Sequence, residues 1–444
     1  MLKTLVSAFK NKDIRKKILI TLGLLFIFRL ASFIPIPGLH PSMFDAVQGG
    51  ETGSILWILS SLTGGALANG ALVALGIAPY INASIIVQLL TVAVPKLEQW
   101  SKQGEEGKRK INNVTRALTL ILAIAQAIGI VVNYGINASF YPIFGEGRNL
   151  DWLIGMFVAL VLVAGAMMTM WIGERITELG IGNGISLLIF VGILSSAGMA
   201  VIHTIGDFGR DGHEAAPWML GGFLLLVVLI FAFIVFIDLS ERRIPIQYAK
   251  QIKGRKQYGG QSTFIPIKVN AAGVLPIIFA NAIITFPQLL FSIVPGTPDT
   301  GWFRFQQNWA EHMGMGTWLF ALITGILIFF FSFFYARIQF NPEEVSRNIQ
   351  QYGGFVPGIR PGKPTQVYLS KITQRITFWG AVFLAFIAIV PGVLFAALLR
   401  DQPGNMLLHG FTATGMLIVV SVALEFEKQL QSQLMMKQYK GFLN

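Results

Sequence analysis

Long apolar segments alternate with polar, turn-rich loops along the whole chain. Each apolar segment is long enough to cross a hydrocarbon core of roughly 30 Å as a helix. A helix also satisfies its own backbone hydrogen bonds, which lipid requires. The pattern predicts an all-α membrane protein with ten spanning helices, over Ile18–Pro35, Ala71–Pro95, Ala117–Tyr134, Trp152–Ile172, Ile185–Ile202, Pro217–Ile237, Ala271–Val294, Gly316–Tyr335, Ile376–Leu399 and Met406–Leu424.

A shorter apolar segment, Ser54–Ala68, precedes the second predicted span. If it crossed the membrane, the basic loop after the second span would lie on the wrong side. We therefore expect this segment to enter from the outer face and return, with a break at Thr63–Gly65. An amphipathic helix on the outer surface is the alternative.

Composition supports the membrane assignment. Hydrophobic residues make up 54% of the chain and charged residues 13%, so the sequence is neither that of a disordered chain nor that of an ordinary soluble enzyme. The net charge is +12, from 34 Lys and Arg against 22 Asp and Glu. A basic balance indicates either a nucleic-acid partner or basic cytoplasmic loops, and the positions of the charges decide between these.

Lysines and arginines lie almost entirely in the N-terminal segment, in the loops after the even-numbered spans and in the C-terminal tail. Because cytoplasmic loops carry an excess of Lys and Arg, both termini are predicted to be cytoplasmic. Arg29 lies inside the first span, near its outer end. We expect its side chain to extend to the interface, with contact to a partner as the alternative. The predicted outer side holds only Arg148, Arg210, Arg304 and Arg400.

Two spans share a short motif. Gly76–Ala83 and Gly273–Ala282 both contain G-x-x-P-x-I followed by an Asn-Ala pair, and each lies in the second span of a set of five. Matching Gly/Pro interruptions in corresponding spans indicate an inverted repeat with a functional site between the halves. A chance match, or prolines that only kink their helices, are the alternatives.

The predicted organisation has a cytoplasmic amphipathic segment, two halves of five spans each, an external hinge loop between them and a cytoplasmic tail. The boundaries are 1–17 for the segment, 18–203 and 217–424 for the halves, 204–216 for the hinge loop and 425–444 for the tail. Two long cytoplasmic loops, 239–270 and 336–375, lie within the second half.

Several kinds of chemistry are not supported by the sequence. The chain has no Cys, its five His are scattered, and no Walker A motif is intact, so we expect no metal, no cofactor and no nucleotide hydrolysis. Gly180–Gly184 predicts a tight helix-start turn, since no strand precedes it. The span interiors carry no acidic residue, which argues against the rival reading of an ion-coupled transporter without excluding an ion held by the backbone. An intramembrane enzyme lacks candidate catalytic groups.

The loop after the sixth span predicts a β-hairpin. Arg243–Lys250 alternates apolar and other residues, Gly254–Gly260 is rich in turn residues, and Ser262–Val269 again has an extended pattern. This places Arg255 and Lys256 near the tip.

The loop after the eighth span, Gly353–Pro364, is rich in Gly and Pro and holds Arg360 exposed. Two shaped basic protrusions indicate docking to an acidic partner, such as ribosomal RNA or an acidic protein face. The alternative is that the positive charges of these loops only orient the protein in the membrane.

Six further motifs are distributed along the chain: Phe33–Gly38, Gly64–Leu67, Gly76–Leu90, Gly180–Ser186, Lys268–Pro276 and Phe355–Gly362. Together they resemble the SecY family, the channel subunits of bacterial protein translocase, and the resemblance runs essentially from end to end. One difference is Phe264, where bacterial relatives commonly have His.

The resemblance implies two inverted five-helix halves around an hourglass pore, with a short re-entrant plug helix at roughly Thr52–Ala66. Stiff β-branched side chains suit a ring that excludes ions yet yields to a polypeptide. The ring would be Ile77, Ile81, Ile189, Ile278, Ile283 and Ile418. The plug would include Ser54, Ile55, Leu56, Trp57, Ile58, Leu59, Leu62, Gly64 and Gly65.

The family's function would be to pass unfolded secretory proteins across the bacterial plasma membrane and to release transmembrane segments into lipid. The implied partners are SecE, SecG, the SecA ATPase, the ribosome, signal peptides, unfolded preproteins and the bilayer. Energy would come from a partner, so the chain itself would not be an enzyme. The lateral gate would involve Pro79, Asn82, Pro276 and Asn281, and partner docking Arg242, Arg243, Lys250, Arg255, Lys256 and Arg360.

Overall fold

The computed structural model describes residues 2–37, 63–67, 69–135, 151–208, 216–248, 251–253, 256–258, 262–293, 300–313, 317–399 and 412–441. The chain forms two compact units. The first comprises Met1–Leu220, Ala282–Phe320 and Phe395–Asn444, and the second comprises Gly221–Asn281 and Ala321–Leu394. The predicted division into two five-span halves stays a prediction.

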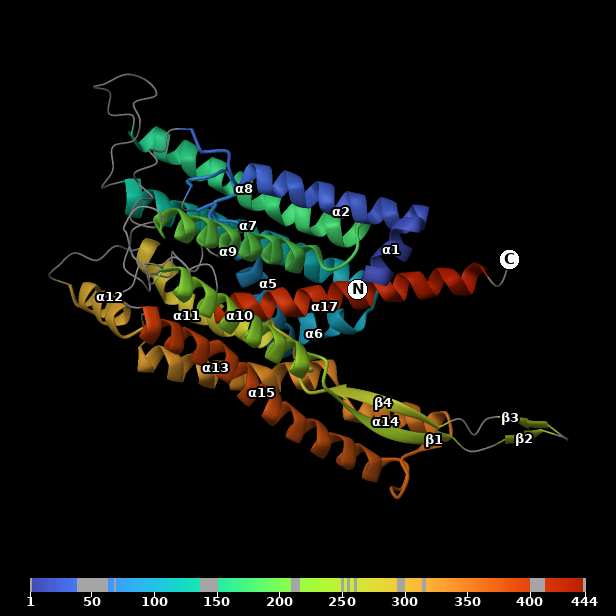
Figure 1. Cartoon of the computed structure of the whole chain (residues 1–444). Helices are drawn as coiled ribbons and strands as arrows, with labels where there is room; N and C mark the ends of the chain where they lie inside the picture. The colour runs from blue at the N-terminus through green and yellow to red at the C-terminus, as the bar shows by residue number, and fades with distance from the viewer. Residues whose placement is uncertain are drawn as a thin grey trace. The chain divides into compact units, whose positions relative to one another are not determined.

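Helices make up most of the described residues (Figure 1). Those of the first unit are α1 Leu2–Lys10, α2 Lys12–Ala31, α5 Ala78–Ala93, α6 Pro95–Lys102, α7 Glu105–Gly135, α8 Asp151–Leu179, α9 Gly184–Phe208, α12 Gly301–His312 and α17 Ala413–Gly441. Helix α14 Pro342–Gln351 belongs to the second unit. Residues of both units occur in α10 Ala216–Asp238, α11 Leu275–Ile293, α13 Trp318–Gln339 and α15 Lys363–Leu399.

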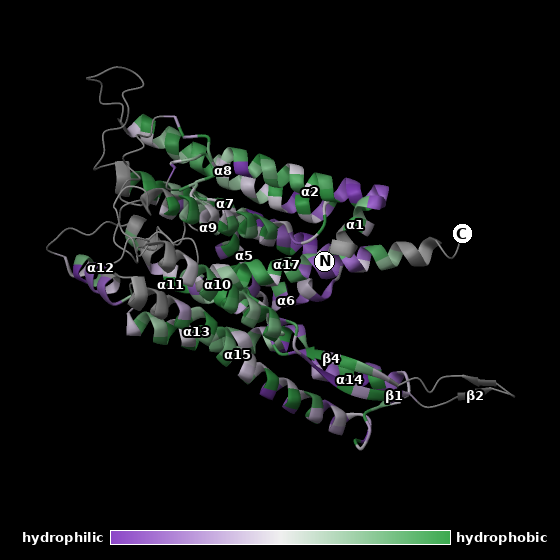
Figure 2. Cartoon of the chain, viewed as in Figure 1, coloured by the Kyte–Doolittle hydropathy of each residue, from purple (hydrophilic) through white to green (hydrophobic). Residues whose placement is uncertain are grey.

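Every predicted span overlaps one of these helices, and the all-α membrane fold is confirmed. By length and apolar composition, the described residues contain six helices able to cross a membrane, or seven if α5 and α6, bent by 99°, form one span. Figure 2 shows hydrophobic residues along α8, α9, α10 and α13 and hydrophilic residues at the start of α2. The total of ten crossings stays a prediction.

Several helices extend beyond the predicted apolar spans. Helix α2 begins at Lys12, α15 begins at Lys363, and α17 continues to Gly441. Hydropathy marks only the part of a helix that suits hydrocarbon. Lys, Arg, Glu and Gln are good helix formers, so the helix continues into the polar flanks.

A tight turn joins α8 to α9, as the glycines of Gly180–Gly184 predict. Gly182 has a φ of +91°, in the left-handed region that glycine adopts without strain. The Asn183 side chain accepts a hydrogen bond from the Ile185 amide at 3.1 Å, which caps the start of α9. The Thr21 hydroxyl of α2 accepts one from the Ile181 amide at 3.1 Å, so the turn is also fixed to α2.

The first unit has an apolar core around α7 and α8. At one end of this pair, Arg116 of α7 donates two hydrogen bonds of 2.8 Å to the carboxylate of Glu174 on α8. Where α8 passes the segment before α5, Gly165 lies against the Leu72 carbonyl, and a Cβ at Gly165 would overlap that oxygen. The core is formed by Ile36, Leu67, Ala74, Leu75, Ala123, Ala127, Ile130, Ile154, Val158, Leu162 and Ala166.

The N-terminal helix α1 packs within the protein through Ala8. Ala8 is fully buried in a cluster with Ile14, Ile18, Ile181 and Leu430, so α1 is joined to α2 and to α17. On the other face of α1, Val6 and Phe9 are exposed. This exposed apolar face fits the predicted position at a membrane surface.

The second unit contains the predicted β-hairpin. Strand β1 Glu241–Tyr248 pairs antiparallel with β4 Ser262–Lys268, and β5 Gly354–Phe355 pairs with the other edge of β1. Farther along the hairpin, β2 Gln251–Lys253 pairs with β3 Lys256–Tyr258 (Figure 1). Strand β3 lies where the sequence predicts a turn, because local turn residues do not exclude a short strand pair next to the tip. The hairpin sits on a core of Ile244, Ile246, Ile267, Ile349, Val356 and Leu369.

The contact at Gly165 makes a testable prediction. Gly165→Ala places a methyl group against backbone that cannot move aside, so we expect the protein to lose about 1–3 kcal/mol of stability, as for other overpacked sites. The measurement is the melting temperature of the purified protein in detergent. Gly198→Ala is the matched control, because Gly198 lies in helix α9 with nothing within 4 Å of an added Cβ. Equal melting temperatures for the two variants would contradict the packing described here.

Candidate functional site

The G-x-x-P motifs have the same local structure in both units. Gly76 has a φ of +53° and Gly273 a φ of +64°, and a helix begins two residues after each. Pro79 and Pro276 are each the second residue of their helix, where a missing amide costs no hydrogen bond. The alternative that these prolines kink the helices is therefore wrong. The glycine ends the preceding turn and the proline fixes the helix start.

The helix start explains a difference from the predicted second span. Helix α5 begins at Ala78, and Ala71–Ile77 forms turns instead of helix. A helix cannot run through a left-handed residue at Gly76. The motif thus produces a non-helical segment directly before α5.

The six isoleucines predicted as a pore ring differ in burial. Ile77, at the N-cap of α5, is 6% exposed, Ile189 in α9 is 4% exposed and Ile418 in α17 is 2% exposed. Ile81 in α5 and Ile278 in α11 are half-buried, and Ile283 in α11 is 39% exposed. Helices α9 and α17 contact each other in the first unit. A shared ring for all six stays a prediction.

The residues predicted for a lateral gate lie at the start of two helices. Asn82 follows Pro79 in the first turns of α5, and Asn281 follows Pro276 in α11. Both prolines are buried and both asparagines are half-buried. Their assignment to a gate is not tested by these positions.

Part of the predicted plug falls within the described residues. Gly64 and Gly65 lie in the turn 63–67, with φ values of +70° and +83°. Arg29 of α2 donates a hydrogen bond from Nη1 to the Gly64 carbonyl oxygen at 2.8 Å. The sequence predicted that Arg29 extends to the membrane interface. Its half-buried side chain instead donates to a backbone carbonyl of this turn. Outside the described residues lie Ser54, Ile55, Leu56, Trp57, Ile58, Leu59 and Leu62.

The two basic loops of the second unit form one surface, which we call the platform: strands β1, β4 and β5 with the 353–362 loop. Strand β5 brings the 353–362 loop to the hairpin, through the pairs Gln247 with Phe355 and Tyr248 with Gly354. The glycine at 354 is required there, because a Cβ would come within 2.9 Å of the Tyr248 ring. The two basic loops therefore lie side by side.

The basic residues of the platform are not equivalent. Arg242 and Arg360 are exposed, and the structure gives neither a side-chain ion pair among the described residues. Arg243 instead donates to Glu241 at 2.7 Å, and its guanidinium lies 4.8 Å from the centre of the Phe264 ring. Phe264 therefore acts as a stacking partner for Arg243.

Three other residues were also predicted for docking: Lys250, Arg255 and Lys256. Lys256 lies in β3, and Lys250 and Arg255 lie outside the described residues.

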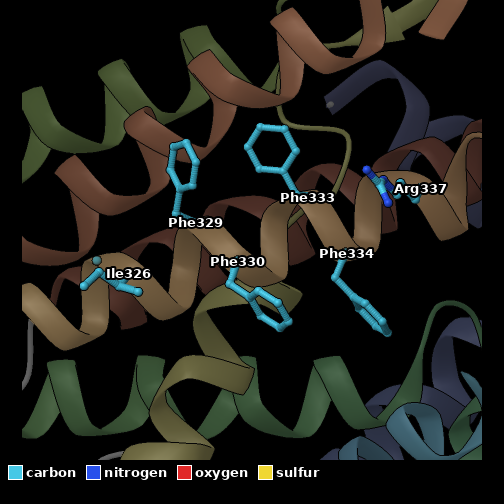
Figure 3. Close-up of a pocket in the computed structure, with 7 residues that line it drawn as sticks. Ile326, Phe329, Phe330, Phe333, Phe334 and Arg337 are labelled. Atoms are coloured by element: carbon cyan, nitrogen blue, oxygen red, sulfur yellow. The ribbon is translucent and has the colours of Figure 1, made fainter. Parts of the chain in front are cut away.

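An aromatic hollow of about 680 Å³ lies along α13 in the second unit (Figure 3). Among the described residues its lining comes from that one helix and includes Phe329, Phe330, Phe333 and Phe334, with Arg337 at one end. A small-molecule site has walls from several elements and convergent polar groups, which this hollow lacks. Within the described ranges, no three His, Cys, Asp or Glu side chains group as metal ligands.

The comparison with known proteins gives the family. The SecY family profile matches residues 71–427. The chain belongs to the SecY family. It is 41% identical to the protein translocase subunit SecY of Streptomyces scabiei and 40% identical to that of Staphylococcus aureus, over 100% of this chain and 100% and 99% of those proteins.

Solved SecY-type structures share the fold. A structure described as a protein-conducting channel matches with a TM-score of 0.63 at 20% identity, covering 94% of this chain and 92% of that one. A Sec61 chain from a canine ribosome–channel complex matches with a TM-score of 0.59 at 18% identity, over the same shares of both chains. This SecY-family chain is thus a multi-span membrane subunit of a protein translocase, not a catalytic enzyme.

Proposed function

We propose that the chain is the protein-conducting channel of a Sec translocon in the bacterial plasma membrane, with both termini in the cytoplasm. Unfolded secretory proteins pass through a ring formed by Ile77, Ile81, Ile189, Ile278, Ile283 and Ile418. The observation that carries this proposal is the full-length similarity to SecY subunits at 41% identity. The burial of Ile77, Ile189 and Ile418 supports a ring that is closed at rest.

The lateral gate is proposed to lie between α5 and α11, at Pro79, Asn82, Pro276 and Asn281. The matching helix starts support this choice. Each gate helix begins abruptly after a left-handed glycine, so it can move as a unit about a non-helical joint. A signal sequence or transmembrane segment would enter lipid there.

Energy and assembly are proposed to come from partners: SecA or a translating ribosome at the platform, with SecE and SecG as companion subunits. Exposed Arg242 and Arg360 support a platform that binds acidic groups. Arg243 has a smaller proposed role in direct docking, since Glu241 and Phe264 already engage it.

The ring makes a prediction about ion leakage. In Ile81→Gly combined with Ile278→Gly, two stiff apolar side chains are lost from the constriction, so it should stay wet and conduct ions without a substrate. Conductance is measured in planar bilayers holding the purified complex. Ile121→Gly is the control, because Ile121 is 62% exposed on α7, away from the proposed ring. A double variant that conducts no more than this control would refute the ring.

The platform makes a separate prediction. Reversing the charge in Arg242→Glu or Arg360→Glu should weaken SecA binding up to about fivefold, since exposed charge contacts contribute up to about 1 kcal/mol each. Arg304→Glu makes the same charge reversal at an exposed position on α12 and should leave SecA binding unchanged. Binding is measured on membrane vesicles at low and high salt. Equal effects of all three variants would show that overall charge, not the platform, attracts SecA.

A further inference from the structure

Arg29 makes a directed contact that simple extension to the membrane surface does not explain. Its Nη1 donates to the Gly64 carbonyl at 2.8 Å, across 35 residues of sequence. Its guanidinium carbon also lies 4.6 Å from the centre of the Phe33 ring. The side chain is half-buried. A charged donor with a backbone acceptor forms one of the stronger hydrogen bonds in proteins, and more so away from water.

The Gly64 backbone is shaped for this contact. A Cβ at Gly64 would come within 2.7 Å of Arg29 Nη1 and within 3.1 Å of the Gly192 backbone in α9. The peptide at Gly64 therefore lies flush between α2 and α9, with its carbonyl against the guanidinium. The neighbouring Gly65 has nothing within 4 Å of an added Cβ. Both glycines have a left-handed backbone, but only Gly64 is closely approached by neighbouring atoms.

A second set of contacts lies just beyond this turn. The Ile36 amide donates to the Gly70 carbonyl at 2.9 Å, and the Leu72 amide donates to the Ile34 carbonyl at 2.8 Å. These backbone bonds join the chain leaving α2 to the chain approaching α5, whatever the side chains are. The Arg29 bond differs because a single side chain makes it. It can break while the backbone bridge remains.

We propose that Arg29 is a positioning residue that latches the 63–67 turn against α2 and α9 when the channel is closed. This inference rests on the proposed channel and on the plug that the SecY resemblance implies at roughly Thr52–Ala66, which ends in this turn. The backbone bridge is the fixed base and the Arg29–Gly64 bond is the releasable contact. Phe33 gives the guanidinium a partner that does not depend on Gly64, so releasing the turn does not leave the charge without a neighbour.

The first test is Arg29→Met in the assembled translocase. This substitution removes the hydrogen-bond donors and leaves an unbranched apolar side chain in their place. We expect ion conductance at rest, without substrate or ATPase, to rise about tenfold, the change that about 1.4 kcal/mol produces. Arg29→Lys keeps a charged donor and should restore part of the closed state. A merely structural role would lower the melting temperature in detergent without this pattern of rescue. Wild-type conductance in Arg29→Met would overturn the latch.

The two glycines give a test that does not alter Arg29. Gly64→Ala and Gly65→Ala introduce the same backbone strain, but only the first displaces the guanidinium. Gly64→Ala should therefore leak more than Gly65→Ala. Equal leakage would overturn the latch, even if Arg29→Met fails to reach the membrane.

The ring variants separate the latch from the channel itself. If Ile81→Gly with Ile278→Gly leaks while Arg29→Met and Gly64→Ala do not, the channel stands and the latch is wrong. If the ring variants also fail to leak, the proposed channel is wrong, and the latch with it.

Discussion

The need to satisfy backbone polar groups away from water governs the first unit. A membrane protein can hold non-helical backbone beside its spans only where other protein covers it. The described backbone at 63–67 and from Gly70 to Ile77 meets that condition. Its amides bond locally, as from Ala71 to the Ala66 carbonyl at 2.9 Å and from Gly76 to the Val73 carbonyl at 2.8 Å. Val73, Ala74 and Leu75 are at most 1% exposed.

The same constraint links local sequence to function. A spanning helix that starts at Gly76–Pro79 leaves non-helical backbone before it, and that backbone needs partners from α2, α8 and α9. Gly165 and Gly192 allow the neighbouring helices to approach closely enough to cover it. Arg29 supplies a side-chain donor to the Gly64 carbonyl. If this turn moves when the channel opens, as we propose, the Arg29 contact is the side-chain contact that must break.

Hydropathy and turn chemistry predicted much of this architecture. The apolar spans locate the helices because hydrocarbon demands length and apolarity. The helix starts at the Gly/Pro motifs were not predicted: the predicted spans begin at Ala71 and Ala271, whereas α5 begins at Ala78 and α11 at Leu275. The hairpin was predicted from the alternation in Arg243–Lys250 and the extended pattern of Ser262–Val269, and its strands are Glu241–Tyr248 and Ser262–Lys268. Strand β5 could not be predicted, because two residues have no period and their pairing with β1 is a long-range contact. The carbonyl that accepts from Arg29 could not be predicted either, since an arginine in an apolar helix does not indicate its acceptor.

The central claim is that a translocating polypeptide passes the proposed ring. The chain contains no Cys, so a single Ile81→Cys can be paired with one Cys in a secretory precursor stalled during SecA-driven export. Oxidation should yield a disulfide between the two that requires a functional signal sequence. If no such disulfide forms at Ile81 or at the other ring positions, although the precursor still crosses the membrane, the polypeptide takes another route and the channel assignment is contradicted.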